Sequence, residues 1–262
     1  MVKYRNIIIC FIQNFSMVIQ MSKIALIIQA RMSSQRLPGK MIMNIAGIPL
    51  YKYVIKRCQN VNSIHDVILA TSTDSSDDQL AEFALKDGFK VFRGYLYNVL
   101  GRYIACAKEI EADIIIRVCG DSPFVDVKII DILLTRFIKK NLDYISLHKV
   151  HCIKGLDSEI VRLSALQRSH DLNSHPDNLE HVTHYIRKNI QLFKTEFIDM
   201  NLDPFDGRIS LTVDTDEDLA FCNAIANALA NRIGSNRFDF FSDDIFRLIK
   251  EIQKDHMESK IC

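Results

Sequence analysis

The sequence predicts an α/β protein whose central sheet is mostly parallel and is covered by helices on both faces. Two observations lead to this prediction. Short apolar runs alternate with segments whose apolar residues recur at helical spacing, and glycine, proline or serine marks the ends of many runs. Such alternation is typical of parallel strands joined by helical crossovers. The composition, 48% hydrophobic and 25% charged over 262 residues, allows a full core.

The first strand is expected around Leu26, Ile27 and Ile28, because such an apolar run can bury on both faces of a parallel sheet. The rest of the first half is expected to contain a helix over 49–59 with proline in its first turn, a strand over 67–71, a helix that opens on a capping box at 75–78 and ends at 86 before a glycine, a strand at 91–92, a helix over 99–110 and a strand over 113–118.

The second half is less regular. Its expected elements are a helix over 127–140, a strand over 144–147, an extended segment over 156–163, a helix over 179–189, strands over 193–198 and 209–213, and closing helices over 216–231 and 241–254. Thr215 and Asp218 fit a capping box at the start of the first closing helix. Because no repeat or linker is visible, we expect one domain over 21–262.

Residues 1–20 are expected to lie outside this domain. Lys3 and Arg5 precede the apolar run 7–12, which faintly resembles a signal peptide but is short and lacks a small-residue cleavage site. Met21 stands directly before the first strand and looks like a natural start. We therefore expect the preceding segment to be poorly ordered or to pack loosely against the core.

Charge and cysteine usage narrow the class of protein. With 33 basic and 32 acidic residues, the chain offers no general surface for nucleic acid or anionic lipid, and it has no apolar run long enough to span a bilayer. The seven cysteines are scattered and never form Cys-x-x-Cys, which favours a reducing cytoplasm over a disulfide framework or a zinc site. Any phosphate binding must come from local clusters.

One such cluster follows the first strand, where Arg31, Arg36 and Lys40 stand in a turn rich in serine, proline and glycine. Ligands of open α/β sheets bind at the carboxyl ends of strands, so these cations suit a polyphosphate. The segment is neither a Walker loop nor a dinucleotide-binding fingerprint. Taken alone, it is also compatible with a solvated basic loop.

Two aspartates at expected strand ends complete the cluster. Asp121 follows the strand over 113–118 and a glycine, and Asp214 follows the expected strand over 209–213. Mg²⁺ binds one or two carboxylates together with phosphate oxygens and water, which this pair would provide. The alternative is that each aspartate only caps a helix or forms a turn. Because Asp218 is occupied by its capping box, Asp214 is the better candidate for a metal ligand.

Taken in order, these motifs resemble the cytidylyltransferase family that joins CTP to acidic sugars, and most closely the branch similar to the spore coat polysaccharide biosynthesis protein F. The resemblance covers roughly residues 22 to 225. The matching segments are the basic loop over 24–40, Ala-Thr-Ser-Thr-Asp at 70–74, Val-Phe-Arg-Gly at 91–94, Asn-Val-Leu-Gly-Arg-Tyr at 98–103, Gly-Asp-Ser-Pro at 120–123, Gly-Leu-Asp-Ser-Glu at 155–159, Glu-His-Val-Thr at 180–183 and Val-Asp-Thr-x-x-Asp-Leu at 213–219.

The resemblance implies a three-layer, Rossmann-like nucleotide-diphospho-sugar transferase fold with one antiparallel strand and a small dimerisation extension. It implies a catalytic set in which Arg31 and Lys40, assisted by Arg36, hold the triphosphate of CTP, and in which Asp121 and Asp214 hold Mg²⁺. Main-chain groups would recognise the base. By family similarity these groups belong to Gln29, Ala30, Ala70 and Thr71. The side chain of Arg93 is a further candidate for a nucleotide contact, and the alternative for it is a surface ion pair.

The acceptor side is less clearly defined by the sequence. Asp157 and Glu159 share one face of an extended segment and either bind sugar hydroxyls or keep an edge strand soluble. His181 and His184 lie three apart on an expected helix. No third metal ligand is evident, so His184 is interpreted as a structural residue. For His181, the family resemblance implies a substrate or dimer contact.

The chain departs from the family pattern at two places. Cys119 replaces a common threonine and is interpreted as a buried thiol, and Ile153-Lys154 replaces Pro-Asp, which brings a cation near the sugar pocket.

The resulting hypothesis is Mg²⁺-dependent transfer of CMP from CTP to a sugar acid, by a homodimer. The alternatives are transfer to a phosphorylated acceptor, which an excess of basic residues in the acceptor pocket would favour, and a non-catalytic nucleotide-binding subunit.

Overall fold

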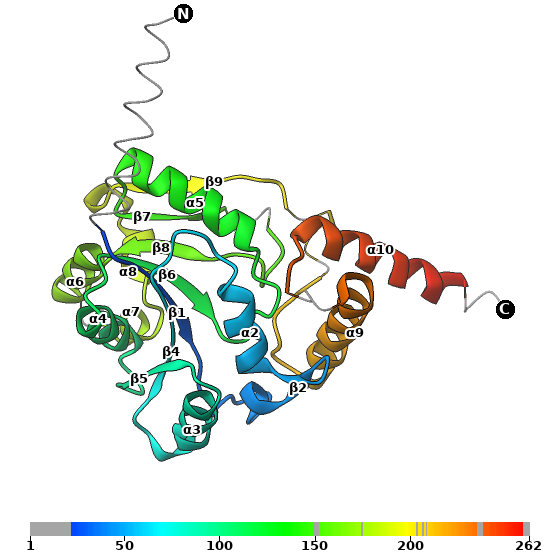
Figure 1. Cartoon of the computed structure of the whole chain (residues 1–262). Helices are drawn as coiled ribbons and strands as arrows, with labels where there is room; N and C mark the ends of the chain where they lie inside the picture. The colour runs from blue at the N-terminus through cyan, green and yellow to red at the C-terminus, as the bar shows by residue number, and fades with distance from the viewer. Residues whose placement is uncertain are drawn as a thin grey trace, which may run out of the picture.

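A central sheet organises the molecule. The computed structural model describes residues 22–148, 152–173, 175–202, 204–205, 207, 209–234 and 238–258, so the expectation for residues 1–20 lies outside the described residues. Within these residues seven strands form the sheet in the order β5-β4-β1-β6-β8-β7-β9 (Figure 1). They are β1 (Ile24–Gln29), β4 (Asp66–Ser72), β5 (Lys90–Gly94), β6 (Ile114–Cys119), β7 (Tyr144–Leu147), β8 (Glu159–Arg162) and β9 (Thr195–Ile198).

The sheet is mostly parallel, as the sequence predicts. The neighbours β5, β4, β1 and β6 all run in the same direction, whereas β8 runs antiparallel to both β6 and β7. In the register of β1, Gln29 stands opposite both Ala70 of β4 and Cys119 of β6, so these strands end at one edge of the sheet. A separate short hairpin pairs β2 (Asn44–Ile45) with β3 (Ile48–Pro49).

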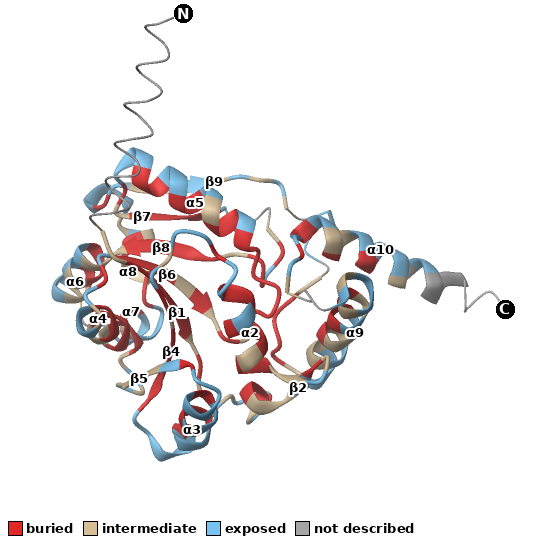
Figure 2. Ribbon diagram, viewed as in Figure 1, coloured by how far each residue is buried: buried red, intermediate tan, exposed pale blue. Residues whose placement is uncertain are grey.

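Helices cover both faces and make the three layers (Figures 1 and 2). Along β1, Leu26 and Ile28 join one apolar cluster while Ala25 and Ile27 join the other. The helices that pack into the first cluster are α2 (Leu50–Cys58), α3 (Asp78–Lys86), α5 (Val127–Lys140), α9 (Asp216–Ile233) and α10 (Ser242–Glu258). Those on the second face are α4 (Val99–Glu109), α6 (Leu163–Leu172), α7 (Pro176–Glu180) and α8 (His184–Lys188).

Short 3₁₀ turns complete the described structure: η1 (Lys40–Ile42), η2 (Ser75–Asp77) and η4 (Ile190–Leu192). The capping box expected at 75–78 is wrong in detail. Asp74 is the residue that caps η2, by accepting a hydrogen bond from the backbone N–H of Ser76, and no side chain caps α3. The capping box between Thr215 and Asp218 at the start of α9 is confirmed.

The helix expected over 179–189 is wrong, because the chain forms two short helices there. α7 ends at Glu180, with His181 as its C-cap, and α8 begins at His184. Between them Val182 has a φ of 27°, which interrupts a right-handed helix. The sequence interpretation also missed α6 (Leu163–Leu172). It assigned Leu163, the first residue of this helix, to the preceding extended segment.

The strand expected over 209–213 is also wrong. In this segment only an isolated bridge between Ser210 and Lys154 appears among the described residues. Apolar residues at Leu211 and Val213 bury as they would in a strand, but the segment crosses the end of the sheet instead of joining it. Asp214 therefore ends an extended segment and not a strand.

None of the helices in the described part of the chain has the length and apolar composition needed to cross a lipid bilayer.

Candidate functional site

The candidate site forms where the end of β6 meets the end of β1. The backbone N–H of Gly120 donates a 2.8 Å hydrogen bond to the carbonyl of Gln29. A Cβ at position 120 would lie 2.9 Å from both the Gln29 carbonyl oxygen and the Ala30 Cβ, so only glycine allows this approach. The contact places the next residue, Asp121, beside the basic loop.

Asp214 reaches the same place from the far end of the chain. The N–H of Val213 donates a 2.8 Å hydrogen bond to the carbonyl of Asp121, which ties the segment 209–214 to the end of β6. The capping box of α9 fixes the junction with that helix, because the carboxylate of Asp218 accepts from the N–H groups of Asp214 and Thr215. Asp218 is therefore occupied, as predicted, and Asp214 faces the site.

Lys40 lies between the two aspartates. Its Nζ is 2.9 Å from Oδ2 of Asp121 and 3.1 Å from Oδ1 of Asp214, and it donates a 2.7 Å hydrogen bond to the carbonyl of Val213. The lysine is buried although it begins η1 in a surface loop. The predicted convergence of Lys40, Asp121 and Asp214 is present in the structure.

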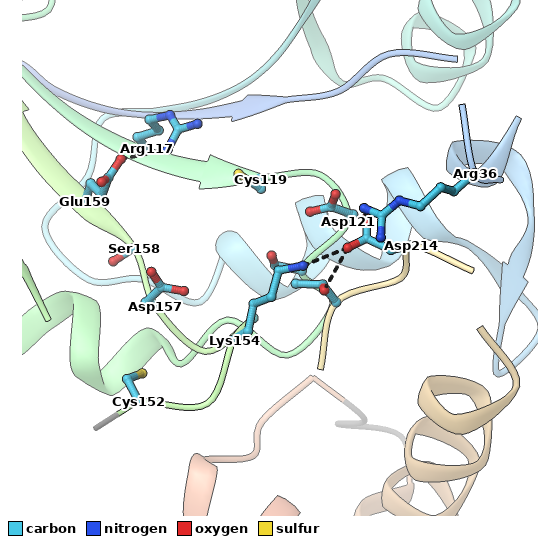
Figure 3. Close-up of a pocket in the computed structure, with 13 residues that line it drawn as sticks. Arg36, Arg117, Cys119, Asp121, Cys152, Lys154, Asp157, Ser158, Glu159 and Asp214 are labelled. Atoms are coloured by element: carbon cyan, nitrogen blue, oxygen red, sulfur yellow. Dashed lines mark hydrogen bonds and ion pairs between the residues drawn. The ribbon is translucent and has the colours of Figure 1, made fainter. Parts of the chain in front are cut away.

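Two more cations contact Asp214. Arg36 Nη2 lies 3.1 Å from Oδ1, and Lys154 Nζ lies 2.7 Å from Oδ2 (Figure 3). Burial raises the pKa of Asp214, but the hydrogen bonds from Lys154 and Lys40 outweigh it and hold that pKa well below its ordinary value. The carboxylate therefore stays ionised at neutral pH.

The donor set fits a hard divalent cation only in part. Asp121 and Asp214 already share one cation, the ammonium of Lys40, so both carboxylates converge on a single position. Among the described residues no group of three or more His, Cys, Asp or Glu side chains is arranged for a metal. A magnesium ion held here would therefore need phosphate oxygens or water to complete its coordination.

Two adjoining clefts meet at this cluster. The first, which we call the loop cleft, has a volume of about 450 Å³. It is lined by Gln29, Ala30, Arg31, Ser34, Gln35, Arg36, Lys40, Met41, Cys119, Asp121, Glu180 and Asp214. Cationic side chains and the hydroxyl of Ser34 line it, which suits a polyphosphate. Arg31 Nη2 lies 3.5 Å from Glu180 Oε1 across the rim, and both side chains are accessible.

The second cleft, the β8 cleft, has a volume of about 430 Å³ and lies beyond Asp121 and Asp214 (Figure 3). It is lined by Arg36, Arg117, Cys119, Asp121, Ser122, Cys152, Lys154, Gly155, Asp157, Ser158, Glu159, Thr212 and Asp214. Three of these residues are basic and four are acidic. Alternating charges and hydroxyl groups of this kind suit a polar ligand with many hydroxyls.

Glu159 lines the β8 cleft but is held by the protein itself. Its carboxylate accepts hydrogen bonds from Arg117 at 2.6 Å, Tyr144 at 2.8 Å and Thr183 at 3.0 Å. β8 lies inside the sheet, so the interpretation of an edge strand kept soluble by acids is wrong. A direct contact between Glu159 and a sugar stays a prediction.

Arg117 connects the two clefts. It stands opposite Glu159 in the antiparallel pair of β6 with β8, and its Nη2 donates a 3.2 Å hydrogen bond to the side-chain oxygen of Gln29, which lines the loop cleft. The neighbouring residue Cys119 is partly buried and lines both clefts, and the desolvation of its thiol raises its pKa to about 11. Cys119 is therefore protonated at neutral pH and unsuited to act as a nucleophile, as predicted.

Other predicted site residues lie outside the lining of the two clefts. Ala70 and Thr71 are fully buried, and the Ala70 carbonyl accepts a hydrogen bond from the N–H of Ala30. Arg93 binds the loop after β4 through the Ser72 carbonyl and the Asp78 carboxylate, which matches the surface ion pair considered as its alternative. His181 is exposed, next to the rim residue Glu180. Their roles toward a nucleotide or substrate stay predictions.

Sequence reasoning missed the partners of Glu159. Thr183 is part of the motif at 180–183, yet its partner lies 24 residues earlier in the chain and only the fold brings them together. Tyr144 gave no signal beyond its place in an apolar strand. Ser122, Ser158 and Thr212 also line the β8 cleft without having been singled out.

Comparisons with known proteins agree with this geometry. The family model described as cytidylyltransferase matches residues 25–245. The spore coat polysaccharide biosynthesis protein SpsF of Bacillus subtilis is 30% identical over 217 residues, which cover 81% of this chain and 90% of that protein. The 3-deoxy-manno-octulosonate cytidylyltransferase of Geobacter metallireducens is 35% identical over 111 residues, 42% of each chain. A solved cytidylyltransferase of Leptospira borgpetersenii superposes with a TM-score of 0.79 at 29% identity, covering 89% of this chain and 96% of that one.

Proposed function

The chain belongs to the cytidylyltransferase family, and from this premise we propose that it transfers CMP from CTP to a sugar acid and releases pyrophosphate. The observation that carries the proposal is the convergence of Lys40, Asp121 and Asp214 at the boundary between two clefts. A reaction between two substrates needs both to meet at one charged centre, and this arrangement offers one cleft to each.

In the proposed reaction a hydroxyl oxygen of the sugar acid attacks the α-phosphorus of CTP in line with the departing pyrophosphate. The new O–P bond forms as the bond to the bridging oxygen breaks, pyrophosphate leaves with the electron pair, and the hydroxyl proton passes to solvent. Catalysis of such a transfer consists mostly of positioning and charge neutralisation.

The loop cleft supplies these functions for the nucleotide. Arg31, Arg36 and Lys40 would hold the triphosphate, and the buried position of Lys40 would keep its ammonium near the reacting phosphate. Mg²⁺ held by Asp121 and Asp214 would neutralise charge on the phosphate oxygens during transfer. Base recognition is assigned to main-chain groups at the ends of β1 and β4.

The β8 cleft would receive the sugar acid, with Asp157 accepting hydrogen bonds from hydroxyls. The named substrate of the Geobacter relative is a sugar acid, which supports an acidic acceptor. The name of the Bacillus relative supports a role in polysaccharide biosynthesis. The cleft has more acidic than basic side chains, so it lacks the basic excess that would favour a phosphorylated acceptor.

The remaining parts of the hypothesis belong to the same proposal. We expect a homodimer, by family similarity, in a reducing cytoplasm. Among the described residues, the thiols of Cys58, Cys106, Cys119 and Cys222 form no disulfide, which is consistent with a reducing environment. A purely nucleotide-binding role is disfavoured because Lys40 and both aspartates are in place.

The proposal is tested by measuring pyrophosphate release with each of the four nucleoside triphosphates and a panel of sugar acids, sugar phosphates and neutral sugars, with and without Mg²⁺. We expect release only with CTP, a sugar acid and Mg²⁺. Replacing Asp121→Asn should slow release roughly a hundredfold, as the loss of one transition-state charge contact does. Equal activity of the variant would show that the metal assignment is wrong.

A further inference from the structure

Lys154 joins the loop before β8 to the charged centre. Its ammonium lies 2.7 Å from Oδ2 of Asp214, and its side chain is 63% exposed in the β8 cleft (Figure 3). In the sequence this lysine stands directly before the Gly-Leu-Asp-Ser-Glu motif at 155–159, whose Asp157 and Glu159 line the same cleft.

The backbone of Lys154 is fixed although its side chain is accessible. Its carbonyl accepts a 2.8 Å hydrogen bond from the N–H of Leu211. The next residue, Gly155, has a φ of 101°, and a Cβ there would lie 2.6 Å from the carbonyl oxygen of Leu211. The backbone of Lys154 is therefore held in place, and the rotamer of its side chain sets the position of the ammonium.

Asp214 has more cationic partners than one carboxylate needs. Lys40 and Arg36 both contact Oδ1, while Lys154 contacts Oδ2, which also accepts a weak bond from Thr212. Lys40 is buried and cannot leave without losing three partners, whereas Lys154 reaches Asp214 from an exposed position. When Asp214 also serves a divalent cation, as the proposed function requires, the ammonium of Lys154 is the positive charge that becomes surplus.

The β8 cleft leaves that ammonium few partners in the protein. Glu159 is already bound by Arg117, Tyr144 and Thr183, and Asp121 is bound by Lys40. Asp157 lies three residues along the same loop and is the remaining acid of the cleft lining. A ligand in this cleft would thus meet one cation and one carboxylate presented by the same loop.

We propose that Lys154 is a specificity-determining residue, whose ammonium binds the anionic group of the acceptor while Asp157 accepts hydrogen bonds from its hydroxyls. The inference rests on the proposed function, because it concerns the acceptor of that reaction. An ammonium is a compact charge with three hydrogen-bond donors, and it can bind the oxygens of either a carboxylate or a phosphate. The lining has more acidic than basic residues, which favours the singly charged carboxylate over the more highly charged phosphate; binding of a phosphate is an outcome of the test.

The experiment compares the wild type with Lys154→Gln, Lys154→Arg and a control, Lys86→Gln, which removes an exposed lysine at the end of α3. Pyrophosphate release is measured with 3-deoxy-manno-octulosonate, its carboxamide, other sugar acids and sugar phosphates. Calorimetry measures the Kd of the acceptor that the wild type uses best, and of CTP with Mg²⁺, for each variant.

We expect Lys154→Gln to raise both KM and Kd for the acidic acceptor by about 10- to 100-fold, as the loss of a hydrogen bond to a charged group does. KM and Kd for CTP should change less than about twofold, Lys154→Arg should recover most of the loss by keeping the charge, and the control should match the wild type. Against the carboxamide, the wild type should lose its advantage over the variant.

Two results would overturn the inference alone. One is an unchanged KM for the acid in Lys154→Gln, and the other is a loss confined to CTP or Mg²⁺, which would show that Lys154 only neutralises Asp214. A wild type that prefers sugar phosphates and weakens equally on substitution would keep Lys154 as the anion contact but reject the carboxylate. No release by the wild type with any pair would reject the proposed function, and the inference with it.

Discussion

At the scale of single residues, the site depends on one ammonium placed between two carboxylates. Lys40, Asp121 and Asp214 come from segments that are far apart in the sequence, and each residue type alone is common at turns. The sequence motifs therefore identify these residues as candidates, but only the fold shows that they contact one another. Lys154 was noticed only as a departure from a pattern, and its bond to Asp214 had no signal in the sequence.

Replacing Lys40→Met should lower kcat/KM for pyrophosphate release by roughly a hundredfold or more, because a charge contact at the reacting phosphate is lost. Steady-state kinetics with CTP and the acceptor measures this. The matched control is Lys52→Met, which breaks the surface pair of Lys52 with Asp87 and should leave kcat/KM unchanged. A Lys40→Met enzyme with wild-type kinetics would remove Lys40 from the mechanism.

Asp214 should also make stability depend on pH. Its pKa is lower in the folded chain than in the unfolded one, so its ionised form stabilises the fold above the unfolded pKa of about 3.9, and this contribution is lost as pH falls below that value. Asp214→Asn should therefore reduce the free energy of unfolding at pH 7, and the difference from wild type should shrink from pH 4 toward pH 2. Urea titrations at several pH values measure it. The exposed Glu82→Gln on α3 is the control, and a difference independent of pH would contradict the assignment.

At the scale of elements, the buried strands and long amphipathic helices follow from periodicity, whereas segments governed by tertiary contacts do not. The predicted bounds of α5 and β7 match the structure, because their apolar spacing is regular. The segment 209–213 has the alternation of a strand, but it lies across the sheet end, where its contacts are with Asp121 and Lys154. The local sequence pattern is the same for a strand within the sheet and for an extended segment across its end. Between α7 and α8, Thr183 likewise makes a tertiary contact, its hydrogen bond to Glu159, that the local sequence does not predict.

The loop at Gly155 gives a test at this scale. Gly155→Ala should lower the free energy of unfolding by about 2 to 4 kcal/mol, because its Cβ would press on the backbone of Leu211 at a positive φ. Gly88→Ala is the matched control: its φ is 80°, but nothing lies within 4 Å of the added atom, so it should cost only about 1 kcal/mol. Chemical denaturation measures both. Equal losses would show that crowding against Leu211 is unimportant.

At the scale of the whole molecule, a buried arginine attaches the end of the described chain to the sheet layers. Arg57 of α2 donates hydrogen bonds to the carbonyls of Val125, Phe238 and Phe240, and its guanidinium lies 3.9 Å from the Phe240 ring. The sequence predicts α2 as a helix with Arg57 on it, but not that this charge is fully buried. The burial of Arg57 depends on its contacts with Phe238 and Phe240, which lie about 180 residues further along the chain.

Arg57→Leu should therefore cost about 3 kcal/mol or more of the free energy of unfolding, because the buried carbonyls of Val125 and Phe240 lose the arginine as their donor. It should also increase amide hydrogen exchange in α10, which begins directly after Phe241. Urea denaturation and exchange mass spectrometry measure the two effects. Lys56→Leu, at the neighbouring exposed position of α2, should change neither. Unaltered protection of α10 in Arg57→Leu would reject this attachment.

The reversed direction of β8 has one more consequence. The loop cleft is lined mainly by the segments that follow β1 and β6. The β8 cleft is lined in addition by the segment that leads into β8. If the proposed function holds, the two substrates would meet at the residues that both clefts share, Arg36, Cys119, Asp121 and Asp214, while the residues from Cys152 to Glu159 would contact the acceptor alone. On that proposal, substitutions in the few positions before β8 would change the choice of acceptor without altering the residues that line only the loop cleft.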